Sequence, residues 1–314
     1  MKNIHDKFVK ASFSDPGRAI SFFEKFLPEK IVDSLDMKTL QCLQESYLSD
    51  DLKAGFSDMV FEVKEKSTPY HALDIVLLFE HKSSPDRHVL LQVGLYMFSH
   101  WWKCIREKKP LKPIIPIIYY QGKKRWKVKS TAQVFDTLSG NLFSFIPEIR
   151  HVFIALHSLS DVEIAALRDR MMAAAVMAQK KAFDVMKLAE DLEKIFRLFP
   201  VKREDGNFLK TIFVYLYKVS EIPKSEWEKA IKTAPSDLKE NLMTTYSWMK
   251  EEGKQEGRLE GRLEGEKIGI HKKEIEVILA LFDDKISVQS IARYTKLSEE
   301  DVTKILKENH KIID

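Results

Sequence analysis

The sequence is poor in the residues that several common classes of protein need. Only two of its 314 residues are cysteines, Cys42 and Cys104, so neither a disulfide framework nor a cysteine-rich zinc site can be built. No apolar run approaches the roughly 20 residues that a membrane-spanning helix needs. The first residues, MKNIHDKFVK, contain no apolar segment of a signal peptide, so we expect a cytoplasmic protein with no membrane partner.

Several catalytic motifs are absent as well. The sequence has no G-x-S-x-G of serine hydrolases and no P-loop, and its nine histidines show no metal-binding spacing. Serine hydrolase and nucleotide hydrolase activities therefore lack support. We expect His81 to lie in the hydrophobic core or to contact the residues that form a site. We expect Asp74 to have a structural role or to lie at an edge. His5 and Asp6 are expected to form a polar pair in a helical entry, where they serve as a helix cap or, alternatively, as auxiliary residues of a site.

Positive charge is concentrated in one part of the chain, although the net charge is only +4. Residues 103–129 hold ten lysines or arginines against one acid, Glu107, with Trp and Tyr among them. Such clusters suit the phosphate backbone of nucleic acids, and a solvated basic edge explains them equally well. The candidate nucleic-acid contacts are Lys123, Lys124, Arg125 and Lys127.

The pattern of apolar residues predicts an α/β core over residues 1–160. The first fifty residues are expected to be helical, with a helix start signal at Ser14 and Asp15 before Pro16, and with a later apolar series of Ile31, Leu35 and Leu40. Strand-like runs follow, and the first two of them should form an antiparallel hairpin. A helix with a serine cap and Pro85 should follow the hairpin. The strand-like runs cover 56–63, 72–82, 114–122 and 151–156. Their sum is a mixed central sheet flanked by helices.

Three further parts follow the core. Residues 161–250 are expected to form a helical subdomain without a chemical motif. In 251–270, glycine recurs every four residues, and most of these glycines directly follow a glutamate. Because glycine and stacked like charges both destabilise an isolated helix, the repeat predicts either a frayed linker or a helix that packs against a partner. The repeat therefore indicates a possible homo-oligomer.

Residues 271–314 are expected to be a small helical segment. Ser287 and Ser298 are plausible helix caps, and the spacing resembles a helix-turn-helix. Lys296 stands where such turns commonly have glycine. A small helical hairpin that only packs is the alternative.

The stretch ALDIVLLFEHKSSP, residues 72–85, holds the clearest chemical signal. An apolar run that ends at Phe79 is typical of a buried strand, and Glu80, His81 and Lys82 follow it. Because side chains alternate along a strand, Glu80 and Lys82 point to one face and His81 to the other. A strand end that reaches solvent and half of an active site are both consistent with this pattern.

Asp58 is the candidate for a second carboxylate. Antiparallel pairing brings the start of the first strand beside the end of the second, where Asp58 and Glu80 could share an ion. Oxygen ligands suit Mg²⁺ or Mn²⁺. Lys82 would then lie near the attacking water, and the two carboxylates would favour its ammonium form.

Two residues of the following helix could assist this site. Gln92 and Tyr96 lie four residues apart on one helical face, from which they could reach the strand ends. Gln92 would be a phosphate or water ligand. For Tyr96, a place in the hydrophobic core is an equally good explanation.

Four blocks of the sequence together carry a resemblance to a known family. They are HDKFVKASFSDPGRAISFFEKFLP, LSDDLKAGFSDMVFEV, LLFEHKSSPDRHVLLQVGLYM and IIPIIYYQGKKRW. They resemble the Rpn (recombination-promoting nuclease/putative transposase) family, within the PD-(D/E)XK nuclease superfamily. This implies a restriction-endonuclease-like α/β core and a Mg²⁺-dependent DNA endonuclease associated with recombination in bacteria.

The resemblance also implies roles for individual residues. Asp58 matches the family's strand acid, and Glu80 and Lys82 match its E-x-K or E-x-Q. The YYQG of residues 119–122 departs from the common YHG. We therefore expect Asp58 and Glu80 to bind Mg²⁺ or Mn²⁺, with Lys82, Gln92 and Tyr96 assisting catalysis on DNA. The alternative is a non-catalytic protein that keeps the nuclease fold, binds DNA and oligomerises; RNA as substrate also stays open.

Overall fold

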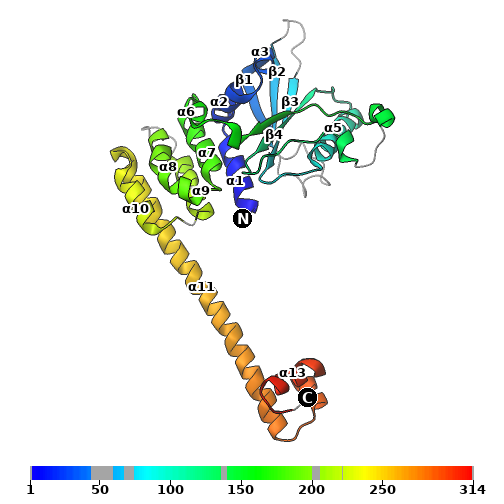
Figure 1. The fold of residues 1–314 in the computed structure, drawn as a ribbon, viewed down its shortest axis with the longest axis vertical. Helices are drawn as coiled ribbons and strands as arrows, with labels where there is room; N and C mark the ends of the chain where they lie inside the picture. Colours follow the sequence, from blue (N-terminus) through cyan, green and yellow to red (C-terminus); the bar gives the residue numbers. More distant parts are fainter. Residues whose placement is uncertain are drawn as a thin grey trace. The chain divides into compact units, whose positions relative to one another are not determined.

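The computed structural model describes residues 2–43, 59–66, 74–135, 140–199, 206–220 and 222–312 (Figure 1). These residues form two compact units, Met1–Thr245 and Tyr246–Asp314. The first unit contains a sheet and most of the helices. The second contains most of one long helix and two short ones. The finer domain boundaries expected near residues 160, 250 and 270 stay a prediction.

Five strands form a mixed sheet in chain order. They are β1 (Leu35–Leu43), β2 (Met59–Glu65), β3 (Asp74–Lys82), β4 (Ile114–Tyr120) and β5 (Val152–Ala155). The first three are antiparallel, which confirms the predicted hairpin, and β4 and β5 continue parallel to β3. A mixed sheet flanked by helices is therefore confirmed.

The expectation of helix over the whole N-terminal region is wrong from Leu35 onward. The short helix α3 (Glu29–Ser34) gives way directly to β1. Leu35 and Met37 are buried with strand periodicity, but the pairing with β2 is irregular between Asp36 and Gln41. This irregularity places Leu40 in the core as well, so the buried positions do not follow strict alternation.

Helices cover both faces of the sheet (Figure 1). On one face, α1 (Lys2–Phe13) and α2 (Pro16–Phe26) bring aromatic rings against the odd-numbered residues of β3. The ring of Phe13 lies 4.5 Å from that of Phe79, between ring centres. On the other face, α5 (Val89–Arg106) packs Val93 against even-numbered residues such as Leu78. The alternation of β3 thus separates an aromatic layer from an aliphatic one.

The α5 helix begins later than the sequence predicts. Its first residue is Val89, and the residue before it, His88, makes no side-chain cap. The expected serine cap and Pro85 therefore lie in the connection from β3. In that connection, Asp86 accepts a hydrogen bond of 2.8 Å from the backbone N–H of His88. By contrast, Asp15 caps α2 as the sequence indicates.

The remaining helices of the first unit pack beside α1 and α2. Helix α7 contacts both of them, and α9 contacts α1. The core between these helices is rich in aromatic residues such as Phe196, Phe213 and Trp227. The helices are α6 (Asp161–Ala165), α7 (Arg170–Lys181), α8 (Val185–Leu198), α9 (Gly206–Val219) and α10 (Lys224–Thr233), with short 3₁₀ helices at Ala132–Val134, Gly140–Phe145 and Leu156–Ser158.

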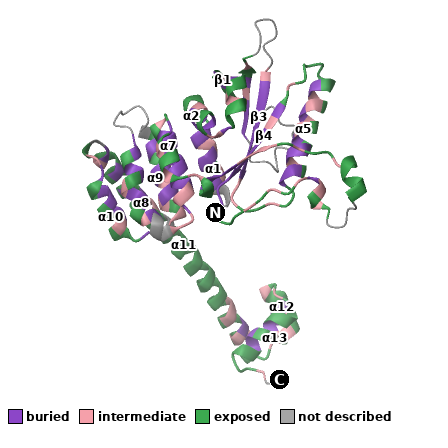
Figure 2. Ribbon diagram, turned by 45° about the horizontal axis from the view of Figure 1, so that its top comes forward, coloured by how far each residue is buried: buried purple, intermediate pink, exposed green. Residues whose placement is uncertain are grey.

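The second unit begins within the long helix α11 (Ser236–Asp283) and ends with α12 (Val288–Thr295) and α13 (Glu299–Glu308). The glycine repeat is helical and exposed (Figure 2). The end of α11 packs on the other two helices through a small core around Ile278, Ile291 and Leu306. None of the helices in the described ranges is both long and apolar enough to cross a lipid bilayer.

The turn between α12 and α13 has the features that the sequence predicts. Ser287 and Ser298 each cap a helix by accepting a backbone N–H. Lys296 adopts the left-handed conformation, with φ of 59°, at the position where glycine is common. The first turn of α13, Glu299–Asp301, is acidic, which suits the helix dipole but repels phosphates.

Candidate functional site at the end of β3

Four polar side chains meet where β3 leaves the sheet. The ammonium nitrogen of Lys82 lies 2.8 Å from Glu80 Oε1 and 2.9 Å from Asp86 Oδ2. It also donates to Gln92 Oε1 at 2.7 Å. We call Glu80, Lys82, Asp86 and Gln92 the Lys82 cluster. Three of its members were predicted from the sequence, and Asp86 was missed.

The fold explains why these residues meet. Glu80 and Lys82 point to the face that α5 covers, because they are two residues apart on a strand. Gln92 lies in the first turn of α5, directly above the strand end, and Asp86 lies in the connection between them. Glu80 is only 5% exposed and the Lys82 side chain 15%. Glu80 and Lys82 are therefore shielded from bulk water, which strengthens the electrostatic interaction between them.

The pKa values of the cluster follow from burial and from close opposite charges. Burial alone would lower the pKa of the Lys82 ammonium, but Glu80 and Asp86 outweigh it, so the pKa is raised. Burial would raise the pKa of Asp86, but hydrogen bonds from Lys82 and from the His88 backbone leave it lowered. At neutral pH, Lys82 is thus a cation and Asp86 an anion.

Tyr96 lies one helical turn beyond Gln92 in a different environment. Its side chain is buried with Val60, Val76, Leu78 and Val93 in an aliphatic cluster. Its ring stacks on that of His100, with centres 6.2 Å apart. This is the environment of a core aromatic residue, the second of the two explanations that the sequence allowed.

The second predicted carboxylate, Asp58, lies outside the described residues. The strand that follows it is described from Met59, which pairs with Phe79 in the antiparallel ladder of β2 and β3. Within the described ranges, no three Asp, Glu, His or Cys side chains converge in a way that could hold a metal ion. The Lys82 cluster nevertheless contains only oxygen ligands besides its ammonium, the chemistry that Mg²⁺ prefers.

Asp74 has the structural place that was expected of it. It lies at the other end of β3, where Lys112 approaches its Oδ2 at 3.1 Å. The same ammonium lies 2.6 Å from Glu62 Oε2. This second lysine–carboxylate group ties β2, β3 and the start of β4 together on the α5 face.

A buried polar network on the opposite face of the sheet was not predicted. His81 Nδ1 lies 2.8 Å from Asp6 Oδ1, and its Nε2 lies 3.0 Å from Gln121 Oε1. The amide nitrogen of Gln121 donates to the Gln179 carbonyl at 3.1 Å and to the Tyr215 hydroxyl at 2.7 Å. The network joins α1, β3, α7 and α9 behind the Lys82 cluster.

His5 and Asp6 belong to this network rather than to a helix cap. His5 Nδ1 lies 2.9 Å from the Tyr215 hydroxyl. Burial is the main reason that the pKa of His5 is lowered, while the hydrogen bond from His81 is the main reason that the pKa of Asp6 is lowered. One indication of this network lies in the sequence. His81 and Gln121 each follow a residue that points to the α5 face, so strand alternation turns their own side chains to the opposite face.

The candidate DNA contacts follow β4 at the same end of the sheet. Tyr120 is the register partner of Lys82, and the Gln121 backbone N–H donates to the Lys82 carbonyl at 2.9 Å. The chain then continues into the basic segment, so this segment starts beside the cluster. The four predicted contacts, Lys123, Lys124, Arg125 and Lys127, are all exposed in it.

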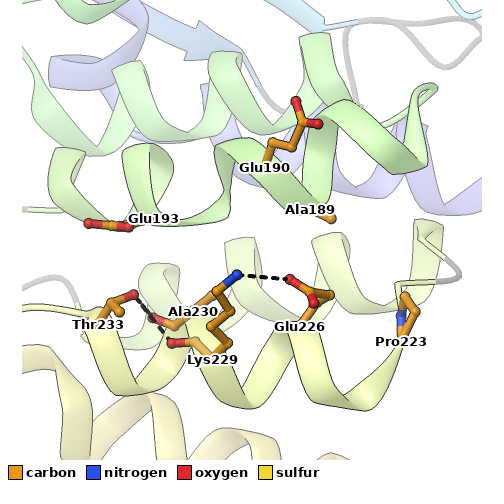
Figure 3. A pocket seen from close by; sticks show the side chains of 8 residues that line it. All are labelled: Ala189, Glu190, Glu193, Pro223, Glu226, Lys229, Ala230 and Thr233. Carbon is orange, nitrogen blue, oxygen red and sulfur yellow. Dashed lines mark hydrogen bonds and ion pairs between the residues drawn. The ribbon is translucent and has the colours of Figure 1, made fainter.

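A pocket of about 380 Å³ lies elsewhere, between α8 and α10 (Figure 3). Glu190 and Glu193 reach it from α8, and Glu226 and Lys229 from α10, where Glu226 and Lys229 form an ion pair of 3.9 Å. The excess of carboxylates repels phosphate groups. This pocket is therefore a poor place for a nucleic-acid backbone.

The sheet, its flanking helices and the Lys82 cluster define a mixed α/β protein with a polar site at one end of its sheet. The chain belongs to the family described as "Putative transposase, YhgA-like", whose model matches residues 3–207. This agrees with the resemblance seen in the sequence. No solved structure matches the chain significantly.

Curated relatives cover most of the chain at low identity. Recombination-promoting nuclease RpnA of Escherichia coli K12 is 22% identical over 306 residues, 95% of both chains. Recombination-promoting nuclease RpnC of the same strain is 24% identical and covers 79% of this chain and 81% of its own. A shorter K12 relative, "Putative inactive recombination-promoting nuclease-like protein YjiP", is 27% identical over 95 residues, covering 30% of this chain and 89% of its own.

Proposed function

We propose that the chain is a Mg²⁺-dependent DNA endonuclease with a PD-(D/E)XK core, associated with recombination. The observation that carries the proposal is the Lys82 cluster, in which a lysine and a carboxylate two residues apart on a buried strand meet a helix glutamine. The names of the relatives RpnA and RpnC support the same activity.

In this proposal the metal is held by Glu80 and Asp58. The pairing of Met59 with Phe79 supports placing Asp58, which lies outside the described residues, opposite Glu80. Mn²⁺ could substitute, since both ions prefer oxygen ligands. When bound, the ion supplies Lewis-acid polarisation of the phosphate and a more acidic water.

The chain's own residues position the reactants. The Lys82 ammonium is held at the end of β3 by Glu80, Asp86 and Gln92. There it would balance charge that develops on the phosphate, and it would orient water by exchanging one of these three hydrogen bonds. Gln92 fixes the ammonium from the helix and offers its amide to a phosphate oxygen. Tyr96 contributes indirectly, because its packing holds α5 against the sheet.

The basic segment after β4 would hold the DNA backbone. Lys123, Lys124, Arg125 and Lys127 are exposed and follow the register partner of Lys82. Such contacts position DNA without reading its sequence. Binding should therefore weaken steeply as salt rises.

Cleavage of supercoiled plasmid tests the assignment. Wild-type protein with Mg²⁺ should cleave the plasmid, EDTA should abolish cleavage, and Lys82→Met should lower the rate of cleavage by about 100-fold or more. Lys112→Met is the matched control, because Lys112 also joins two carboxylates but at the other end of β3. It should retain cleavage.

Three results would contradict the proposal in different ways. Plasmid cleavage by Lys82→Met at the wild-type rate would refute the site. Cleavage of single-stranded RNA in preference to plasmid would refute the substrate class. DNA binding by wild-type protein, without cleavage and without Mg²⁺ binding in calorimetry, would favour the non-catalytic alternative, the class that the name of YjiP represents.

A further inference from the structure

Helix α5 carries an apolar stripe on its exposed side. Leu91, Leu95, Phe98, Trp102 and Ile105 follow one another at intervals of four, three, four and three residues. Their exposed fractions lie between 43% and 62%. We call these five residues the α5 stripe. The spacing is the heptad pattern by which one helix packs against another.

The opposite side of the same helix is already occupied. Val89, Val93, Tyr96 and His100 are buried and face the sheet. The segment 89–102 contains no Lys, Arg, Asp or Glu. A helix that is apolar all round is ordinarily buried on all sides, whereas a surface helix presents charged residues to water. The α5 stripe therefore lacks the polar character of a solvent face.

The area of the stripe is sufficient for a specific interface. Five large side chains that are about half exposed present roughly 500 Å² of apolar surface, given their usual size. Patches of this area on soluble proteins commonly mark interaction sites. Two such stripes packed together bury roughly 1,000 Å², which is the lower limit for a specific protein–protein interface.

We propose that the α5 stripe binds a second copy of this chain, with the two α5 helices antiparallel around a two-fold axis near Phe98. The stripe is nearly symmetric about Phe98, so this axis brings Leu91 opposite Ile105 and Leu95 close to Trp102 of the other copy. Such self-complementarity is what a two-fold interface requires.

The charges at the end of α5 favour the antiparallel arrangement over the parallel one. Lys103 and Arg106 lie in its last turn. Parallel pairing would place them beside the same residues of the other copy, where like charges repel. Antiparallel pairing places them at opposite ends of the interface.

The arrangement has a consequence that rests on the proposed nuclease function. Gln92 of the Lys82 cluster lies on α5, next to Leu91 of the stripe. Pairing of two α5 helices would hold two clusters at a fixed separation. A dimer should therefore cut both strands of a duplex in one binding event, while a monomer should release nicked circles.

Sedimentation velocity of the full chain tests the pairing. Wild-type protein at micromolar concentration should sediment as a dimer, at twice the monomer mass of 36.5 kDa. The double variant Leu95→Glu, Trp102→Glu should raise the dissociation constant by about 100-fold or more, since it buries like charges in the interface. Val162→Glu, at an exposed apolar position on α6, should leave the mass unchanged.

Cross-linking gives an answer that does not depend on a destabilising variant. Phe98→Cys should form a covalent dimer under mild oxidation, and Val162→Cys should not. A monomeric wild type, a dimer that survives the double variant, or equal cross-linking of the two cysteine variants would overturn the pairing.

Plasmid assays separate this inference from the proposed nuclease function. If the dimer forms and its loss changes linear product into nicked product, both hold. If the dimer forms but no variant or wild type cleaves DNA, the pairing stands and the nuclease proposal fails.

Discussion

Replacing Gln121 by methionine should destabilise the first unit by about 2–6 kcal/mol. Gln121 is only 2% exposed, and its amide is the centre of the polar network behind β3. Methionine has a similar volume but no hydrogen-bonding amide, so it fills the space and removes the bonds. His81 Nε2 and the Gln179 carbonyl would both lose a partner.

The magnitude follows from counting the buried polar groups that the substitution leaves without a hydrogen-bond partner. Each buried polar group without a partner costs about 1–3 kcal/mol. The Tyr215 hydroxyl contributes less, because it keeps its contact of 2.9 Å with His5. Two unpaired groups therefore account for the expected loss in the free energy of unfolding.

Urea unfolding followed by tryptophan fluorescence measures this loss. Gln41→Met, at an exposed position of the edge strand β1, is the control and should change stability by less than about 0.5 kcal/mol. A Gln121→Met variant as stable as the control would refute the reasoning. It would mean that the network adds little to the docking of α1, α7 and α9.

Three further changes test other parts of the structure. The side chain of Asp191 is 10% exposed, and two lysine ammonium groups lie 2.6 and 2.7 Å from its carboxylate. Burial raises the pKa of Asp191, but the two lysines outweigh burial, so the pKa lies below its usual value. Asp191→Asn should therefore cost about 1–3 kcal/mol at pH 7. The difference from wild type in acid unfolding should begin to shrink as the pH falls toward about 4, the pKa of an unfolded aspartate, and should vanish only below the lowered pKa of the folded state. An added Cβ at Gly257 or Gly261 meets no heavy atom within 4 Å. Changing both to alanine should stabilise α11 by about 2 kcal/mol, whereas a lower melting temperature by circular dichroism would indicate a helix packed on the glycines. Lys296→Gly should raise the melting temperature of the second unit, because the left-handed conformation costs a lysine about 1 kcal/mol; no change would show that the turn relaxes.

Much of the fold was predictable because its signals are local. The apolar run of β3 and the cap at Asp15 each depend on neighbouring residues only, and both predictions are confirmed. The β1 strand was missed because an irregular pairing with β2 breaks its alternation between Asp36 and Gln41. That pairing is a tertiary contact, which residue spacing does not reveal.

In the candidate site, too, the residues in regular elements were predictable, whereas those placed by turns or tertiary contacts were not. Strand parity predicted that Glu80 and Lys82 share a face, and helical spacing brought Gln92 to them. Asp86 was missed because it belongs to a turn, where position depends on the backbone path and not on a period. The network around Gln121 joins residues up to 210 positions apart in the sequence, so no local pattern could have found it.

The alternation at the end of β3 makes its pairing register unusually sensitive to error. Glu80 and Lys82 have partners on one face, and His81 has different partners on the other. A shift of one residue would turn both charged side chains toward Asp6 and Gln121 and would turn His81 toward Gln92. Such a misfolded form would lose two sets of buried contacts at once. We therefore expect insertions or deletions within β3 to abolish folding and the geometry of the Lys82 cluster together, so that misaligned copies of the protein would not persist in a folded form with a displaced cluster.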